Sequence, residues 1–162
     1  MAVCCKNLRL ERGFRASKRT VLDGVTLRCD AGAVYGLLGP SGCGKTSLLY
    51  CVVGMLKPNE GQVLVDGRPP GTVDLGLPGH LAGYMPQDIA LHKYFTPREV
   101  LRYYGVVFGS DGLDERIDHL VGLLGLANDG ADKRRIGLLS GGQKRRVSLA
   151  CALVHSPKLL VL

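Results

Sequence analysis

Eight residues of the chain have the types and spacing needed to hold a phosphate group. Gly39 to Thr46 read GPSGCGKT, which matches the pattern G-x-x-x-x-G-K-[ST]. Glycines let the backbone curl so that successive N–H groups point at phosphate oxygens, and a helix that starts here presents its positive end to the same anion. Lys45 would reach the outer phosphates of a nucleoside triphosphate, and the Thr46 hydroxyl would ligate Mg²⁺. Ser47 could also reach a phosphate oxygen.

The sequence on either side decides between a phosphate-binding loop and a glycine-rich turn that contains a lysine by chance. The apolar run AVYGLLG, residues 33–39, precedes the motif and is typical of a strand buried in a sheet. After Lys45 the apolar residues follow helical spacing. Strand, loop and helix in this order favour phosphate binding. Cys43 lies inside the loop and could be a redox-sensitive thiol, although a tolerant loop position is the simpler interpretation.

A second glycine-rich turn, Leu139 to Gln143, reads LSGGQ. Ser140 and Gln143 have the S-x-x-Q spacing of a capping box, which satisfies backbone N–H groups at the start of a helix. The box does not explain the two adjacent glycines, each of which weakens a helix by about 1 kcal/mol relative to alanine. Glycines are suited to this position if a ligand approaches the backbone closely. The bare helix end and the Ser140 hydroxyl would then form a second anion site.

The remaining sequence divides into a strand-rich part, a helical part and a final strand. Thr96 and Pro97, with Glu99 three residues after Thr96, mark the start of the first helix of the helical part. The residues 71–80 are typical of a loop, and 128–137 of a polar connector. Strands are predicted at 2–10, 21–29, 33–39, 60–65 with a turn at Asp66–Gly67, 81–87 and 157–162, and helices after Lys45, at 96–109, at 114–127 and from Ser140.

Length, composition and charge limit the number of domains, the compartment and the kind of partner that we expect. A length of 162 residues predicts one domain, and 46% hydrophobic with 22% charged residues is ordinary for a globular one. The net charge of +7 fits either a solvated basic surface or a polyanionic partner. The six cysteines lack C-x-x-C spacing, and no histidine has metal-ligand spacing from them, so reduced thiols in the cytosol are expected. The N-terminus lacks the apolar core of a signal peptide, and no stretch is apolar enough to span a bilayer.

Taken together, the motifs resemble those of the nucleotide-binding domain of an ABC ATPase. GPSGCGKT is similar to the family's Walker A motif, YMPQ to its Q-loop and LSGGQKRR to its signature motif, in the family's order. The segments YGLLGPSGCGKTSLL and GYMPQDIALHKYFTPREVL resemble the G and H subfamilies, most of all the half-transporters of insects. The resemblance implies an α/β fold: a P-loop NTPase core at 1–87 and 138–162, an N-terminal antiparallel β part and a helical subdomain at about 88–137.

The resemblance also implies a set of site residues and partners. Two such domains pair head to tail, and the signature of one closes over the ATP held by the other. Gln87 would contact Mg²⁺ and the attacking water, so that Thr46 and Gln87 are the metal ligands and Lys45 and Gln87 the catalytic residues. Residues 88–95 would face a transmembrane domain of the parent chain, an integral membrane protein with this domain on its cytosolic face. The implied contacts of ATP are Gly39, Ser41, Gly42, Cys43, Gly44, Lys45, Thr46, Ser47, Gln87, Ser140, Gly141, Gly142 and Gln143, with Phe14 as the candidate for stacking on adenine.

The last strand, KLLVL, is similar to the Walker B strand of the family, which an Asp and a catalytic Glu follow. Because the sequence given ends at Leu162, we expect an incomplete domain that lacks its C-terminal part. The intact parent is expected to be an ATPase that drives transport. The piece itself is expected to bind nucleotide weakly and to hydrolyse it negligibly, because the groups that position water are missing.

Two other classes compete with a transporter subunit. A soluble ABC ATPase acting on nucleic acid or ribosomes carries the same motifs, and the basic runs 133–135 and 144–146 could touch phosphates. The expected place of 144–146 is nevertheless the exposed face of the signature helix. Relatives in DNA repair insert a long coiled coil before the signature, and no heptad run occurs here, so no nucleic-acid partner is expected. A kinase or GTPase outside the family does not account for LSGGQ and YMPQ.

Overall fold

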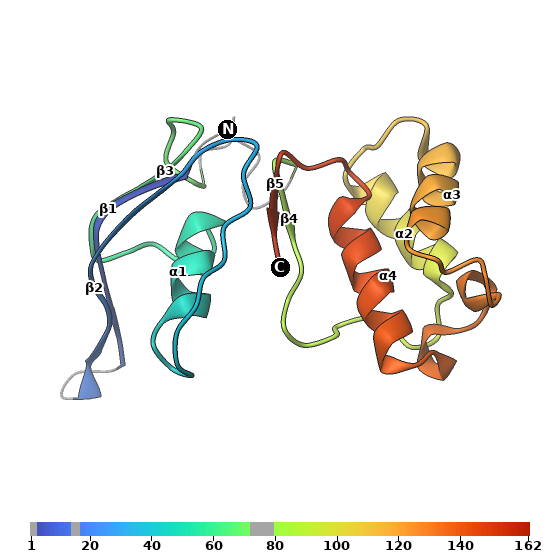
Figure 1. Cartoon of the computed structure of the whole chain (residues 1–162), viewed down its shortest axis with the longest axis horizontal. Coiled ribbons are helices and arrows are strands. Elements are labelled where there is room, and N and C mark those ends of the chain that lie inside the picture. The colour runs from blue at the N-terminus through green and yellow to red at the C-terminus, as the bar shows by residue number, and fades with distance from the viewer. Residues whose placement is uncertain (1–2, 14–16, 72–79) are drawn as a thin grey trace. The chain divides into compact units, whose positions relative to one another are not determined.

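The computed structural model describes residues 3–13, 17–71 and 80–162. The chain forms two compact units, Met1–Pro78 and Gly79–Leu162 (Figure 1). The finer division into a core and a helical subdomain at about 88–137 stays a prediction. Phe14 and nearly all of the predicted loop 71–80 lie outside the described residues.

The first unit is built on a three-stranded antiparallel sheet. Its strands are β1 (Val3–Arg12), β2 (Arg19–Cys29) and β3 (Glu60–Val65), in the order β2-β1-β3. The central strand β1 alternates buried and exposed residues at its start, and Val3 lies opposite both Cys29 and Val65. The antiparallel β part predicted for the N-terminus is therefore confirmed.

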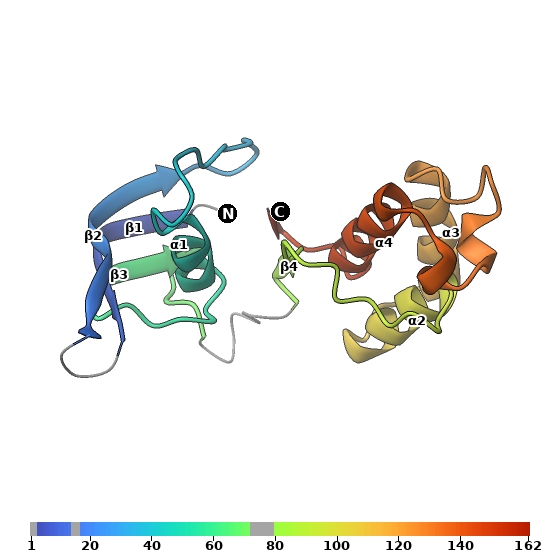
Figure 2. The same cartoon turned by 90° about the horizontal axis from the view of Figure 1, so that it is seen from below.

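One short helix packs against this sheet. Helix α1 (Lys45–Val52) contacts β2 and β3 and buries Leu48, Cys51 and Val52 (Figure 2). The predicted turn after β3 is also present, since Asp66 and Gly67 have φ of 53° and 76° and the backbone groups of Val65 and Arg68 exchange hydrogen bonds of 2.8 and 3.1 Å. Two consecutive residues with positive φ are the mark of a type I′ turn.

The prediction of a buried strand at 33–39 is wrong for this structure. The segment has no ladder, and Val34 and Leu38 are 101% and 93% exposed. An apolar run becomes a buried strand only when neighbouring strands satisfy its N–H and C=O groups and other side chains cover its faces. The described residues of this unit supply neither, because β1, β2 and β3 pair with one another.

The second unit combines a strand pair with helices. Strands β4 (Ala82–Tyr84) and β5 (Leu159–Val161) run parallel, with Gly83 opposite Leu160. The helices are α2 (Pro97–Val107), α3 (Leu113–Leu123) and α4 (Gly141–Leu153), and short 3₁₀ turns, η3 (Ala131–Lys133) and η4 (Ile136–Leu138), occupy the predicted connector. The predicted capping box of α2 is present, since the Thr96 side chain accepts from the Glu99 N–H and the Glu99 carboxylate accepts from the Thr96 N–H.

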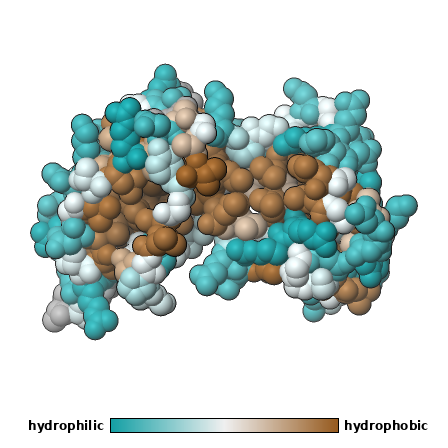
Figure 3. Space-filling view, viewed as in Figure 1, coloured by the Kyte–Doolittle hydropathy of each residue, from teal (hydrophilic) through white to brown (hydrophobic). Residues whose placement is uncertain are grey.

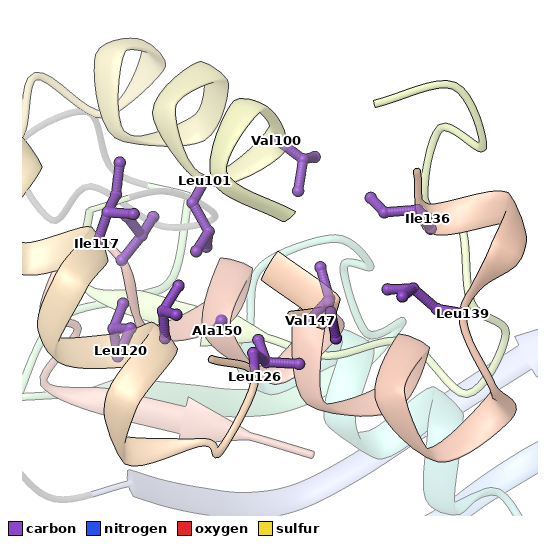
Figure 4. Close-up of a cluster of buried hydrophobic side chains, with 12 residues drawn as sticks. Val100, Leu101, Ile117, Leu120, Leu126, Ile136, Leu139, Val147 and Ala150 are labelled. Atoms are coloured by element: carbon purple, nitrogen blue, oxygen red, sulfur yellow. The ribbon is translucent and has the colours of Figure 1, made fainter. Parts of the chain in front are cut away.

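One hydrophobic core holds these helices together. The side chains that meet in Figure 4 come from α2, α3, α4 and the connector before α4, and they include Leu101, Ile117, Leu126, Ile136 and Val147, each at most 2% exposed. Packing of the connector against α4 sets the place where the LSGGQ turn begins. An ion pair supports the same region, because Arg98 of α2 binds both Asp118 and the buried Asp132 at 2.6 and 2.7 Å.

Apolar side chains also reach the surface of both units (Figure 3). Among the described residues, no helix is long and apolar enough to cross a membrane.

Candidate nucleotide-binding site

Residues 39–43 of the first motif form an exposed loop that leads into α1. Gly42 and Gly44 have φ of 80° and 98°, a left-handed conformation that only glycine adopts at little cost. Gly44 is constrained twice, because a Cβ there would lie 2.6 Å from the Val21 carbonyl oxygen of β2. Glycine is thus required where the loop passes closest to the sheet, and the curl predicted from the sequence is present.

The N-terminal end of α1 is open to an anion. Helix geometry leaves its first N–H groups without intrahelical partners. Among the residues that the structure describes, no side chain caps them, and no acidic residue stands in the first turn. A site with these properties attracts negative charge through its N–H groups and its dipole.

Lys45 holds its ammonium group against the same loop. Its Nζ donates to the carbonyl oxygens of Gly39 and Pro40 at 2.8 and 2.7 Å and lies 3.7 Å from the Cys43 Sγ. The positive charge is therefore concentrated where the loop curls. A phosphate that enters would replace or share these contacts.

The residues of this motif fit a magnesium nucleotide. Thr46 is exposed in the first turn of α1, and Ser47 beside it is half-buried. The described residues contain no group of three or more His, Cys, Asp or Glu side chains that could hold a metal ion by themselves. Mg²⁺ typically takes one or two protein oxygens together with water and phosphate oxygens, and the Thr46 hydroxyl is an oxygen of the kind it takes.

The second motif forms a capped turn at the start of α4. The Ser140 Oγ accepts from the Gln143 N–H at 3.2 Å, and the Gln143 Oε1 accepts from the Ser140 N–H at 2.8 Å. The capping box predicted from the sequence is therefore confirmed. Ser140, Gly141 and Gly142 are exposed, whereas Gln143 is only 8% exposed. Because Ser140 Oγ accepts within the box, its hydroxyl proton remains available to an external acceptor.

Asp129 fastens this turn from outside the motif. Its Oδ2 accepts from the Gln143 Nε2 at 2.5 Å, and its Oδ1 accepts from the Ala131 N–H at 3.1 Å. Desolvation raises the pKa of Asp129, but the Ala131 N–H, the Gln143 amide and the charge of Arg134 together hold this pKa below its ordinary value. Both ends of the Gln143 amide are thus bound within the protein.

Gln87 follows β4 on an exposed, irregular segment. The structure connects it to the second motif through Arg145 of α4, whose Nη1 donates to the carbonyl oxygens of Pro86 and Gln87, each at 2.9 Å. Sequence reasoning missed Arg145 and Asp129 as parts of this region. No spacing rule joins residue 145 to residue 87, so nothing in the sequence could have indicated the contact.

The prediction that 144–146 lie on the exposed face of the signature helix is wrong. All three side chains are half-buried, and each donates to backbone carbonyls: Lys144 to Gly137, Arg145 to the Q-loop segment and Arg146 to Leu124 and Gly125. Carbonyls at the ends of neighbouring elements need donors, and long basic side chains can supply them while their stems cover apolar surface. The run 133–135, in contrast, is exposed.

Comparisons with known proteins agree with this geometry. The ABC transporter family model matches residues 22–162. The ABC transporter G family member 20 of Dictyostelium discoideum is 40% identical over 100% of this chain and 22% of its own length. The Nod factor export ATP-binding protein I of Sinorhizobium fredii is 37% identical over 89% of this chain and 42% of its own length. The chain therefore spans less than half of the length of each of these curated relatives.

The solved structures that resemble this chain are also ABC ATP-binding domains. A dimeric ATP-binding cassette in a post-hydrolysis state, bound to ADP and Pi, superposes with a TM-score of 0.82, 25% identity and coverage of 98% of this chain and 72% of that one. A bacterial Atm1-family ABC exporter with ATP bound superposes with a TM-score of 0.80 and is 28% identical. The match covers 98% of this chain and 28% of the exporter chain. Fold and motifs define an α/β nucleotide-binding domain of the P-loop NTPase type. The chain belongs to the ABC transporter family, and the predicted fold class is confirmed.

Proposed function

We propose that this chain binds ATP with Mg²⁺ through the loop 39–46, and that the longer protein type represented by its relatives hydrolyses ATP to drive transport across a membrane. The observation that carries the proposal is the placement of the Lys45 ammonium on the loop carbonyls beside an uncapped helix end. Family membership supports it, because the structural relatives include a cassette bound to ADP and Pi and an exporter with ATP bound.

Within this proposal each predicted residue has a role. The N–H groups of 39–46 and the Lys45 ammonium stabilise charge on the phosphate oxygens, which is the main requirement of phosphoryl transfer. Thr46 and Gln87 are the proposed protein ligands of Mg²⁺, and Gln87 also contacts the attacking water. Bound Mg²⁺ supplies further neutralisation of phosphate charge. Phe14 remains our candidate for stacking on adenine.

The partners are part of the same proposal. Ser140, Gly141 and Gly142 present a hydroxyl and helix N–H groups to solvent, which suits them to the outer phosphate of an ATP held by a second nucleotide-binding domain. A solved dimeric structure of a bacterial ABC transporter cassette supports the pairing of two such domains, and we propose that they pair head to tail. We also propose a transmembrane domain as partner of residues 88–95, a location on the cytosolic face of a membrane, and a half-transporter of the insect G/H type, for which the G-family relatives give general support.

The experiment that tests nucleotide binding compares Lys45→Ala with the native chain. Loss of a charge-assisted contact to phosphate is expected to weaken ATP binding at least about 30-fold, measured with a fluorescent ATP analogue in the presence of Mg²⁺. Lys57→Ala is the matched control, since Lys57 follows the C-terminal end of α1 and is expected to leave affinity unchanged. Equal affinity in native chain and Lys45→Ala would refute the assignment.

A further inference from the structure

We infer that Arg145 is a positioning residue that joins the Q-loop to the signature turn, so that Gln87 and Ser140 respond to nucleotide together. The inference rests on the proposed function, because it assigns a coupling role within the same nucleotide-binding elements. It concerns contacts inside the second unit alone.

The contact itself is specific. One guanidinium nitrogen of Arg145 lies 2.9 Å from the carbonyl oxygen of Pro86 and 2.9 Å from that of Gln87. Arg145 stands four residues after Gly141, so its Cα lies one turn into α4 on the helix that Ser140 caps. A shift of the Gln87 backbone is therefore felt by the first turns of that helix, and the reverse also holds.

Other contacts tie the ends of the same segment to the C-terminal end of α4 and to the connector before it. At its start, β4 packs so closely on α4 that a Cβ at Gly83 would collide with the Ala152 carbonyl. At its end, the N–H groups of Ile136 and Gly137 donate to the carbonyls of Phe95 and Lys93 at 2.7 and 2.8 Å.

Residues 87–91 between these points are irregular. Across the part of the chain that the structure describes, the hydrogen bond found between this stretch and the rest of its unit is the one from Arg145 to the Gln87 carbonyl. Leu91 packs against the hydrophobic core of the helices and anchors the far side of this stretch. With both sides anchored and a guanidinium bound at Gln87, the backbone there can move, but not independently of α4. We infer that a change at Gln87 reaches the signature turn through the hydrogen bonds of Arg145.

Arg146 shows that contact with the Q-loop is not a property of every basic residue in 144–146. It is adjacent on the same helix and equally donates to two carbonyls, at 2.9 and 3.2 Å, but these belong to Leu124 and Gly125 after α3. Removing either guanidinium deprives two carbonyls of a donor. Only the loss of Arg145 releases the Q-loop.

Hydrogen–deuterium exchange of the full chain during ATP titration tests the inference. In the native chain, ATP with Mg²⁺ is expected to slow exchange in three peptides, 39–46, 85–91 and 139–144, the last two at the same half-saturating concentration. In Arg145→Gln the response of 139–144 is expected to fall by at least about fivefold, the lower end of ordinary coupling factors, while 39–46 responds as before. Arg146→Gln is expected to retain all three responses, and Arg145→Lys, which keeps the charge and a donor, to retain part of the response at 139–144.

The outcomes separate the two hypotheses. An undiminished response of 139–144 in Arg145→Gln, with 39–46 still responding, would overturn the role of Arg145 and leave ATP binding intact. If Arg145→Gln and Arg146→Gln reduced the response of 139–144 equally, the role of Arg145 would also be overturned, because destabilisation of α4 would then be enough to explain the reduced response. If 39–46 fails to respond in the native chain and behaves like Lys45→Ala, the proposed function itself is refuted, and the coupling role falls with it. A thermal melt of each variant confirms that the comparison is made on folded protein.

Discussion

The two glycine-rich turns of the chain both open a helix, but side chains cap only one of them. Before α1, the loop 39–44 is largely exposed and its N-cap residue, Gly44, offers no side chain. Before α4, Ser140 and Gln143 form a complete capping box, and Asp129 binds the back of it.

This difference matches two ways of meeting the same anion. A loop that wraps around a phosphate must leave its N–H groups free for the phosphate oxygens, and its own lysine adds positive charge. A turn that closes on a phosphate held elsewhere needs a fixed surface. Its inner N–H groups are therefore satisfied by side chains, and one hydroxyl and two glycine N–H groups remain outside.

The largest expected contrast concerns cysteine reactivity, because Cys43 lies in the open loop. Cys43 is exposed, whereas Cys5 and Cys51 are fully buried, and burial raises the pKa of Cys5 to about 12. At pH 8 only about one Cys5 thiol in 10⁴ would be ionised, so its alkylation by iodoacetamide is expected to be more than about 1000-fold slower than that of Cys43. Mass spectrometry of timed samples measures both rates.

The alkylation experiment has its control in Cys43→Ser, which removes the fast phase. ATP with Mg²⁺ is expected to slow the modification of Cys43 in the native chain. Modification of Cys5 at the rate of Cys43 would show that the first unit is open in solution, and the contrast between turns would lose its basis.

The second contrast lies within the open loop, between its two left-handed glycines. Gly44→Ala is expected to cost about 3 kcal/mol of unfolding free energy, since the new Cβ has an unfavourable φ and collides with the Val21 carbonyl. Gly42→Ala has the same φ problem but open space around the new Cβ, and is expected to cost about 1 kcal/mol. Urea denaturation of the two variants compares them. Equal costs would mean that the approach of the loop to β2 is not a constraint.

The sequence predicted the parts of this picture that depend on local chemistry. The glycine pattern and the capping boxes are written in neighbouring residues, and the structure confirms the capped turn and most of the predicted helices and strands. The failure at 33–39 has a different origin, because whether Val34 and Leu38 are buried depends on strands and side chains elsewhere. Arg145 and Asp129 were missed for the same reason: their contacts join residues 58 and 14 positions apart.

A smaller effect is expected from exchanging the two polar groups behind the capped turn. Gln143→Glu keeps the capping box but places a second carboxylate against Asp129, and is expected to lower the melting temperature slightly, because the hydrogen bond to Asp129 is lost and two like charges face each other. Adding Asp129→Asn restores an amide–carboxylate pair with the roles reversed, and is expected to recover most of that stability and the ATP response of 139–144. Thermal melts and hydrogen exchange measure both quantities. A double variant no better than Gln143→Glu would show that Asp129 does not position the turn.

The smallest expected effect is a pH dependence confined to acid. Because contacts in the folded chain hold the pKa of Asp129 below its ordinary value of 3.8, the unfolded chain takes up this proton first as the pH falls. The stabilisation from Asp129 is therefore complete above about pH 5, declines as the pH passes below the ordinary value, and is lost once the folded carboxylate is protonated. Asp129→Asn is expected to flatten this part of the stability profile between pH 2 and 5 and to leave the profile above pH 5 unchanged in slope. If the stability of the native chain and of Asp129→Asn fell in parallel between pH 2 and 5, the acid sensitivity would come from other carboxylates. The charge of Asp129 would then make no contribution to the stability of the capped turn.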